Sequence, residues 1–337
     1  MTLILALETS CDDTCAAVVS GDGEVRSNVI SSQGIHDAFG GVVPEIASRH
    51  HLELANAVVD DALRRAGATL DDIGLIAVTQ GPGLVGALLV GVATAKGIAA
   101  ARGLPLAAVD HLQGHVAANF LRSDPGGHPT MEPPFVCLIA SGGHTLLARV
   151  EDHEGFTVLG RTLDDAAGEA FDKGARLLGL PFPGGPALER LARDGDPAAF
   201  AFPVARNLAG LDFSFAGVKT SLLYKVRELG EGGARERAAD LAASYQHAIV
   251  EALAERCERA LAQTHSARLA IGGGVAANGP LRERLSGLGG VELGIPPREL
   301  CTDNAAMIAS AGRFVAALAF PDYLALDAYA SGERALA

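Results

Sequence analysis

Two histidines separated by three residues are the most specific chemical signal in this sequence. His111 and His115 lie in LPLAAVDHLQGHVAANF, a run that predicts a strand ending at Asp110, a good helix N-cap, followed by a helix. A spacing of four places both imidazoles on one helix face, one turn apart. Neutral imidazole nitrogens in this arrangement can bind one metal ion, although a stacked pair of surface or core histidines has the same spacing.

A carboxylate would complete such a site, and Asp303 in CTDNAAMIASAG is the candidate. We expect a helix to begin there, with Thr302 as its cap. A carboxylate at this place could equally serve only as a charge that interacts with the helix dipole. Two histidines and one carboxylate leave coordination positions open, which suits iron(II), and zinc fits as well.

The histidine spacing also occurs in metallopeptidases. Their H-E-x-x-H motif places a glutamate base between the two histidines, whereas this chain has Leu112, Gln113 and Gly114 there. Because a glutamine amide cannot accept a proton from water near neutral pH, peptide hydrolysis is disfavoured.

Two glycine-containing loops could hold phosphate. SGGHT (141–145) allows close approach of a ligand to the backbone at Gly142 and Gly143. GGGVAANGPLRERL (272–285) follows an apolar run, and its Asn278 and Pro280 predict the start of a helix. Asp172 could accept hydrogen bonds from ribose hydroxyls, although it and the nearby Asp164, Asp165 and Glu169 are also what a solvated helix face would show.

Strands and helices in mixed order must position these residues. The pattern of hairpins and strand–helix alternation predicts an α/β fold with mixed sheets. The expected strands are Leu3–Leu7, Ala16–Val19, Leu75–Thr79, Leu106–Val109, Phe135–Ala140, Thr145–Val150 and Leu269–Ile271. The expected helices include Ile46–Ala66, Val85–Ala101, Ala166–Leu178, Arg235–Gln263 and Asp303–Leu318.

The segments 3–19 and 135–150 both read as strand, polar turn, strand, so they are either duplicated copies of one unit or two unrelated hairpins. Boundaries are expected at the Pro/Gly-rich stretch 123–134 and near 289–297. We therefore expect a first lobe of residues 1–110 plus 301–337, to which the last helix returns, and a second lobe of residues 111–300.

Composition limits the possible partners and environment. The 337 residues carry a formal net charge of −13, so binding of nucleic acid would need a local basic patch or a partner protein. The five cysteines are scattered, which indicates reduced thiols. The start lacks the basic region of a signal peptide, and Lys96, Arg102 and Pro105 interrupt the longest apolar stretch, so we expect a cytoplasmic protein without a membrane span.

Ten motifs, taken together, resemble the universal tRNA threonylcarbamoyladenosine transferase family, formerly called O-sialoglycoprotein endopeptidase or glycoprotease. They run in family order over nearly the whole chain, and the chain is similar to the bacterial branch. The motifs are LALETSCDDT (5–14), GGVVPEIASRHH (40–51), VTQGPGLVGALLVG (78–91), HLQGH (111–115), SGGHT (141–145), DDAAGEAFDKGARLLGL (164–180), PGGP (183–186), FSFAGVKT (213–220), IGGGVAAN (271–278) and CTDNAAMIA (301–309).

The resemblance implies an actin-like ATPase (ribonuclease H-like) fold, with two duplicated lobes and a nucleotide in the central cleft. It implies that His111, His115 and Asp303 hold one iron(II), and that Asp12 and Asp13 are catalytic, with Asp12 orienting the substrate amine. The family usually has Glu at the position of Asp13, so the charge is kept but the reach is shorter. The implied contacts of the adenylate are Ile139, Ala140, Ser141, Gly142, Gly143, Asp172, Gly185, Asn278 and Glu189, the last replacing an Asp found in some members.

The implied reaction transfers a threonylcarbamoyl group from threonylcarbamoyl-AMP to N6 of adenosine 37 in tRNAs that read codons beginning with A. The implied partners are the tRNA anticodon loop, a catalytically inactive paralogue as heterodimer partner, and a small ATPase. Basic residues available for tRNA on this chain are Arg49, His50, His51, Lys219 and Arg298. The alternative functions are a metallopeptidase and a non-catalytic, actin-like nucleotide-binding protein.

Overall fold

The computed structural model describes residues 2–122, 130–206 and 208–330, and the chain divides into two compact units. Residues 1–132, 152–155 and 299–337 form the first unit, and residues 133–151 and 156–298 form the second. The first unit therefore continues beyond Asp110, where the first lobe was expected to end, and reaches Glu132, within the stretch 123–134. The reason is that the helix after Asp110 packs on the returning C-terminal helix, so His111 and His115 belong to the same unit as Asp303.

The first unit is built on a five-stranded sheet with the order β3-β2-β1-β4-β5. β1, β2 and β3 pair antiparallel, and β4 and β5 are parallel to β1. β1 can be central because its sequence LILALE is buried on both faces. The strands are β1 (Leu3–Glu8), β2 (Asp13–Ser20), β3 (Val25–Ser32), β4 (Ile73–Gly81) and β5 (Leu106–Asp110).

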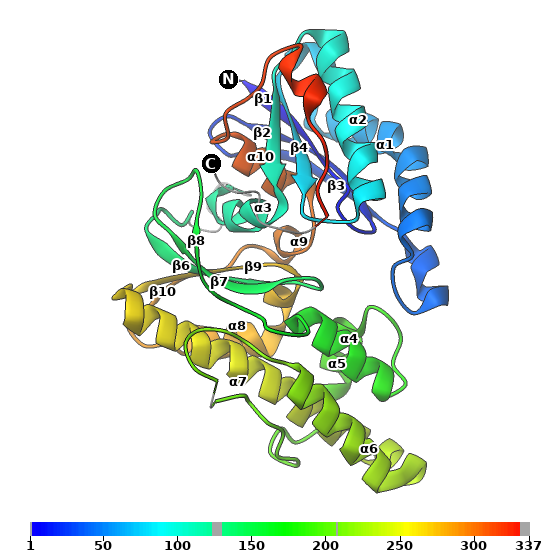
Figure 1. Ribbon diagram of the computed structural model, residues 1–337, viewed down its shortest axis with the longest axis vertical. Helices are drawn as coiled ribbons and strands as arrows, with labels where there is room; N and C mark the ends of the chain where they lie inside the picture. Colours follow the sequence, from blue (N-terminus) through cyan, green and yellow to red (C-terminus); the bar gives the residue numbers. More distant parts are fainter. Residues whose placement is uncertain (1, 123–129, 207, 331–337) are drawn as a thin grey trace. The chain divides into compact units, whose positions relative to one another are not determined.

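Helices cover both faces of this sheet (Figure 1). α1 (Pro44–Ala66) and α2 (Val85–Arg102) pack on one face, while α10 (Ala305–Gly312) lies on the other beside α3 (His111–Ala117). The 3-10 helix η1 (Gly34–Phe39) joins β3 to α1, and the short α9 (Arg298–Cys301) precedes α10 where the chain returns to this unit. α2 is long and apolar enough to pass a test for a membrane span. Its Val92, Ala95 and Ala99 face the sheet and belong to the hydrophobic core of the unit.

The second unit repeats the same topology. Its sheet has the order β10-β9-β6-β7-β8, in which β6, β7 and β8 pair antiparallel and β9 and β10 extend the sheet in parallel. Strand for strand this matches the first sheet, which supports the duplication. The strands are β6 (Phe135–Ala140), β7 (Thr145–Val150), β8 (Thr157–Arg161), β9 (Arg268–Gly272) and β10 (Glu292–Gly294). The helices are α4 (Ala167–Leu177), α5 (Gly184–Ala192), α6 (Ala216–Glu236), α7 (Ala238–Thr264) and α8 (Gly279–Ser286).

All seven expected strands and the expected α/β class are present, but three strands were not among them. β3, β8 and β10 lie at sheet edges, where polar and exposed residues replace the apolar pattern. The last helix is shorter than expected, beginning at Ala305 and ending at Gly312. Its cap is Asn304, whose side chain accepts from the Met307 N–H, and not Thr302.

Candidate active site

The two histidines of α3 share one buried face of the first unit. The Asp110 side chain accepts hydrogen bonds from the Leu112 and Gln113 N–H groups, so it caps the helix as predicted. The two imidazole centroids are 4.7 Å apart, and the ring planes are inclined by 78°. Both rings are almost completely buried, His111 being 4% exposed and His115 0%.

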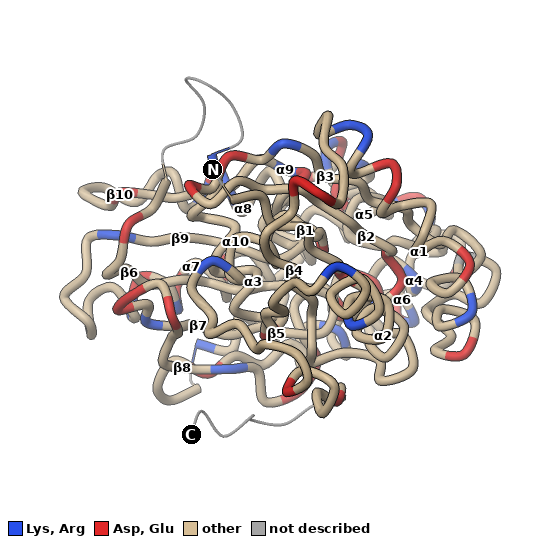
Figure 2. The backbone as a smooth tube through the Cα atoms, turned by 90° about the horizontal axis from the view of Figure 1, so that it is seen from above, with Lys and Arg blue, Asp and Glu red and all other residues tan. Residues whose placement is uncertain are grey.

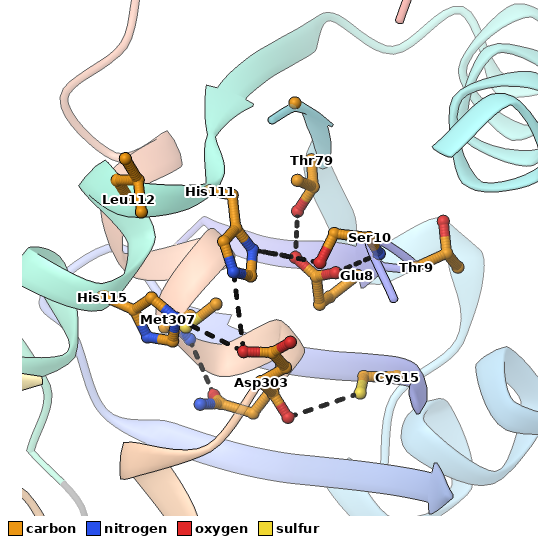
Figure 3. Close-up of polar contacts among 12 residues, drawn as sticks. Glu8, Thr9, Ser10, Cys15, Thr79, His111, Leu112, His115, Asp303 and Met307 are labelled. Carbon is orange, nitrogen blue, oxygen red and sulfur yellow. Dashed lines mark hydrogen bonds and ion pairs between the residues drawn. The ribbon is translucent and has the colours of Figure 1, made fainter. Parts of the chain in front are cut away.

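Asp303 meets these rings from the residue pair that precedes α10 (Figure 3). Its Oδ1 lies 3.5 Å from His111 Nε2 and 3.3 Å from His115 Nε2. The three ligand atoms lie within 4.8 Å of one another. Ligand bonds of about 2.0–2.2 Å give separations of about 3–3.5 Å between ligand atoms. The two distances from Asp303 Oδ1 match this range, so the three residues could share one ion.

The state of His115 supports a metal at this position. Neither of its buried ring nitrogens makes a hydrogen bond with any residue the structure describes. Apart from the 3.3 Å contact of Nε2 with Asp303, the buried ring has no polar partner among the described residues, and coordination of an ion by Nε2 would offset the resulting desolvation cost. α3 packs so closely on α10 that a Cβ at Gly114 would lie 2.7 Å from Ile308 Cδ1, and this contact limits movement of the helix that carries His115.

Glu8, at the end of β1, is a site residue that the sequence analysis missed. Its Oε2 lies 3.0 Å from His111 Nδ1 and accepts from Thr79 Oγ1, while Oε1 accepts from the Ser10 N–H. A carboxylate on one ring nitrogen fixes the tautomer and leaves the other, here Nε2, for a metal. In the sequence, the only sign of this role was that Glu8 is a single acidic residue at the end of an apolar strand.

Electrostatic interaction between Glu8 and His111 shifts the pKa values of both groups. Burial alone raises the pKa of Glu8, but the adjacent His111 outweighs it and lowers that pKa below the usual value. Burial lowers the pKa of His111, but the negative charges of Asp303 and Glu8 outweigh it and raise that pKa to about 9 in the metal-free protein, so a metal bound at Nε2 would displace a proton.

The carboxylates of Asp12 and Asp13 belong to the same unit, at the start of β2. Burial raises the pKa of Asp13 to about 7, with Asp303, Asp12 and Glu8 adding repulsion and a hydrogen bond from Ser32 opposing it. A carboxyl group with a pKa near neutrality can exchange a proton at physiological pH. A bound cation would relieve the repulsion among these four carboxylates.

Two of the basic residues suggested for tRNA contact have other roles. His51 is completely buried, and its ring contacts Thr14 Oγ1 at 2.8 Å and the Cys11 carbonyl at 2.9 Å, so it supports the loop of Asp12 and cannot reach a nucleic acid. Lys219 forms an ion pair with Asp165, 2.7 Å away, which Lys173 also contacts.

In the second unit, the SGGHT loop and the loop after β9 meet at the carboxyl ends of two parallel strands, β6 and β9. Ile139 and Ala140 are the buried last residues of β6, and Ser141 begins the turn, with its N–H donating to the His144 carbonyl at 2.8 Å. A Cβ at Gly273, which has φ +87°, would lie 2.3 Å from the Ala140 carbonyl oxygen. Such strand ends are the usual ligand-binding edge of α/β sheets.

Gly142 and Gly143 face open space, since a Cβ on either would meet nothing within 4 Å. The backbone beneath them is supported by α4, whose Gly168 N–H donates to the Ser141 carbonyl at 3.1 Å. A ligand phosphate can therefore approach this backbone without steric hindrance.

Asp172 and Asn278 join the helices around this edge. Asp172 Oδ1 accepts from the Gly184 N–H at 2.8 Å, just before Gly185 in the first turn of α5. Asn278 caps α8, as predicted, and its Nδ2 donates to Glu189 Oε2 at 3.1 Å and to Gln246 Oε1 at 2.9 Å. The longer Glu189 side chain is thus already part of this polar cluster.

A cavity of about 420 Å³ opens beside that cluster, within the size range of small-ligand pockets. Helices α5, α7 and α8 supply its walls, which expose mainly apolar surface. The lining includes Glu189, Arg193, Gln246, His247, Pro280 and Arg284.

Comparisons with known proteins identify the family to which the chain is similar. Residues 24–310 match the family TsaD, tRNA N6-adenosine threonylcarbamoyltransferase. The chain is 52% identical over 317 residues to the tRNA N6-adenosine threonylcarbamoyltransferase of Symbiobacterium thermophilum, with 93% of this chain and 91% of that protein covered. It is 51% identical over 317 residues to that of Clostridium perfringens (strain SM101 / Type A), with 93% and 92% covered.

Solved structures of low sequence identity share the fold. The (R)-2-hydroxyglutaryl-CoA dehydratase component A of Acidaminococcus fermentans is 14% identical, with a TM-score of 0.55, and 93% of this chain and 96% of that chain are covered. Full-length HypF in its phosphate- and nucleotide-bound form is 13% identical, with a TM-score of 0.58 and coverage of 93% and 46%. The fold is the expected actin-like ATPase fold. On the family match and the identity to its curated relatives, the chain belongs to the tRNA N6-adenosine threonylcarbamoyltransferase family.

Proposed function

We propose that this chain transfers the threonylcarbamoyl group from threonylcarbamoyl-AMP to N6 of adenosine 37 in tRNA, using a metal site of His111, His115 and Asp303. The observation that carries the proposal is the convergence of two buried imidazoles and one partly exposed carboxylate, from two distant segments, on one point. The family match supplies the reaction class.

The donor set of two imidazoles and one carboxylate suits iron(II), with zinc as the alternative. A metal held there would act as a Lewis acid toward phosphate or carbonyl oxygen of the substrate. Glu8 would keep His111 in the tautomer that exposes Nε2, and the burial of both rings would exclude competing water.

For the adenylate we propose the carboxyl-end edge of the second sheet. The contact residues are those named above, from Ile139 to Gly143, together with Asp172, Gly185, Glu189 and Asn278. The open backbone at Gly142 and Gly143 suits the phosphate, the carboxylates of Asp172 and Glu189 can accept from ribose hydroxyls, and the cavity beside Asn278 suits the flat base.

Asp12 and Asp13 would serve the incoming amine. The exocyclic N6 amine is a weak nucleophile that forms a C–N bond to the carbamoyl carbon while AMP leaves with the C–O bonding electrons. The amine must lose a proton in this step. An Asp13 carboxylate with a pKa of about 7 can accept that proton, and Asp12 would orient the amine.

The charge of the chain bears on its partners and environment. Acidic and basic residues are interspersed over the described residues (Figure 2), and the net charge of −13 does not favour tRNA binding by this chain alone. We therefore include an inactive paralogue as heterodimer partner and a small ATPase in the proposal, with no membrane, and we place the protein in the cytoplasm with its tRNA substrate.

Mass spectrometry of tRNA nucleosides tests the function. The chain is incubated with unmodified tRNA, threonine, bicarbonate, ATP and the partner proteins. N6-threonylcarbamoyladenosine should appear only when this chain is present. Cleavage of peptides by the purified chain would instead favour the metallopeptidase, which the family match and Gln113, bonded through its side chain to the Glu154 carbonyl, do not support.

Replacing Gly142 with alanine tests the phosphate site. The added Cβ meets no protein atom within 4 Å, so the free energy of unfolding should stay within about 0.5 kcal/mol of the original. Nucleotide affinity, measured by isothermal titration calorimetry, should fall about tenfold or more, because the methyl group occupies the space through which phosphate reaches the backbone. Gly217→Ala, also in open space but on α6, is the control and should bind nucleotide normally.

A further inference from the structure

The segment after η5 (Asp322–Ala325) runs back over the ends of β4 and β5 in the first unit. Gln80 Nε2 donates to the Asp327 carbonyl at 2.7 Å, the Tyr329 N–H donates to the Gln80 carbonyl at 3.3 Å, and the Gly83 N–H donates to the Ala330 carbonyl at 3.1 Å. Lys96 of α2 donates to the carbonyl groups of Leu324, within η5, and of Leu326, at the start of the segment.

The side chain of Tyr329 extends from this segment to Asp110, the N-cap of α3. Its hydroxyl lies 2.7 Å from Asp110 Oδ2, to which it can donate, and 2.8 Å from the Gly81 carbonyl. The other oxygen of the same carboxylate, Oδ1, accepts the Leu112 and Gln113 N–H groups. Asp110 is thereby fixed from both sides.

The backbone at Gly81 is shaped for this contact. Gly81 has φ +156°, and a Cβ there would lie 2.4 Å from the Tyr329 carbonyl oxygen and 2.8 Å from the Tyr329 ring. Only a glycine at position 81 leaves room for Tyr329, so Tyr329 contacts the backbone of β4 as well as the Asp110 side chain.

We propose that Tyr329 is a positioning residue for the metal site: through Asp110 it fixes the first turn of α3, and with it the direction of the His111 and His115 rings. The inference rests on the proposed metal site. The Tyr329 hydroxyl connects the C-terminal segment to α3, and two of the seven residues of this helix are the predicted metal ligands. A small rotation of so short a helix would separate His115 from Asp303, which come from different segments.

Tyr323 provides a matched control. It lies in the same C-terminal region, is 0% exposed, and its hydroxyl has no hydrogen-bond partner among the described residues. Tyr323→Phe and Tyr329→Phe each remove one phenolic oxygen, but only the second removes a bond to Asp110.

The test is titration of the metal-free full chain and of both variants with Co²⁺, following the visible absorption of the bound ion and competition with a chelator. Tyr329→Phe should weaken Co²⁺ binding about three- to tenfold, less than the loss expected for a residue bonded to a ligand, and alter the absorption band. Tyr323→Phe should bind like the original protein. In an Asp110→Ala background, Tyr329→Phe should cause no further loss.

A purely structural role would lower the melting temperature of the metal-free Tyr329→Phe variant and leave the Co²⁺ affinity and spectrum unchanged, and that result would overturn the inference. An equal effect of Tyr323→Phe would overturn it too. If the original protein binds no Co²⁺, the proposed metal site fails and this inference fails with it, whereas equal binding by the original and Tyr329→Phe refutes the inference alone.

Discussion

Replacing His111 with alanine is expected to abolish metal retention and tRNA modification together. His111 contributes Nε2 to the three-ligand group, and loss of one of three protein ligands leaves an imidazole and a carboxylate that cannot hold an ion against water and buffer. The measurements are metal content per chain after gel filtration and N6-threonylcarbamoyladenosine formed in the reconstituted reaction. We expect metal near zero and a loss of product of at least about 100-fold, since the mutation removes electrostatic stabilisation of the transition state.

Two further variants separate a metal role from a folding defect. His111→Ala leaves the buried Glu8 without its cationic neighbour, which by itself can destabilise the protein. Asp303→Asn removes a ligand charge from a side chain that is 24% exposed and should give the same loss of metal with normal circular dichroism. The control His265→Asn removes an exposed imidazole at the end of α7, where φ is +53° and Asn is tolerated. Full modification by metal-free His111→Ala protein would refute the role assigned here.

Replacing Asp13 with asparagine should stabilise the metal-free protein and at the same time inactivate it. The pKa of Asp13 is about 7 in the folded chain, against 3.8 for an ordinary Asp, because burial and neighbouring carboxylates disfavour its charged form. The folded state therefore binds this proton more tightly than the unfolded state. The contribution of Asp13 to the free energy of unfolding is greatest below about pH 4, declines as the pH rises toward 7, and is constant above that.

The size of the effect follows from the same shift. A change from 3.8 to about 7 corresponds to at most about 4 kcal/mol, and access of solvent to a partly buried side chain reduces this to about 2 kcal/mol. Urea unfolding should therefore show Asp13→Asn to be more stable than the original by about 2 kcal/mol at pH 8 and equal to it near pH 4. Loss of the proton acceptor should lower the rate of tRNA modification about 100-fold or more.

Asp60→Asn is the control for this pair of measurements. Asp60 is an exposed carboxylate on α1 of the same unit, so its replacement should change neither stability nor activity. A lower free energy of unfolding for Asp13→Asn at pH 8 would show that the Asp13 carboxylate makes favourable interactions in the folded protein and is not repelled by its neighbours. A stabilised variant with full activity would exclude Asp13 from catalysis.

The local features of the site were predictable because they depend on residues close in sequence. The cap at Asp110, the shared face of His111 and His115, and the cap at Asn278 follow from the geometry of a single helix, and all three are observed. The central strands were likewise predictable from their apolar runs, and the order of ten motifs indicated the family. Edge strands and the true cap at Asn304 were missed, since polar edge residues and neighbouring Thr, Asp and Asn side chains all suit several local structures.

The sequence alone therefore determined the family, the α/β class and a pair of imidazoles one turn apart. Only the tertiary structure decided that Asp303 reaches those imidazoles, that Glu8 orients one of them, that His51 is buried, and that Tyr329 bonds to their helix cap. Each of these contacts joins segments separated by tens to hundreds of residues. Such contacts arise from the pairing of β1 with β4 and from the packing of α3, α10 and the C-terminal segment in one unit, which the periodicity of a local sequence cannot encode.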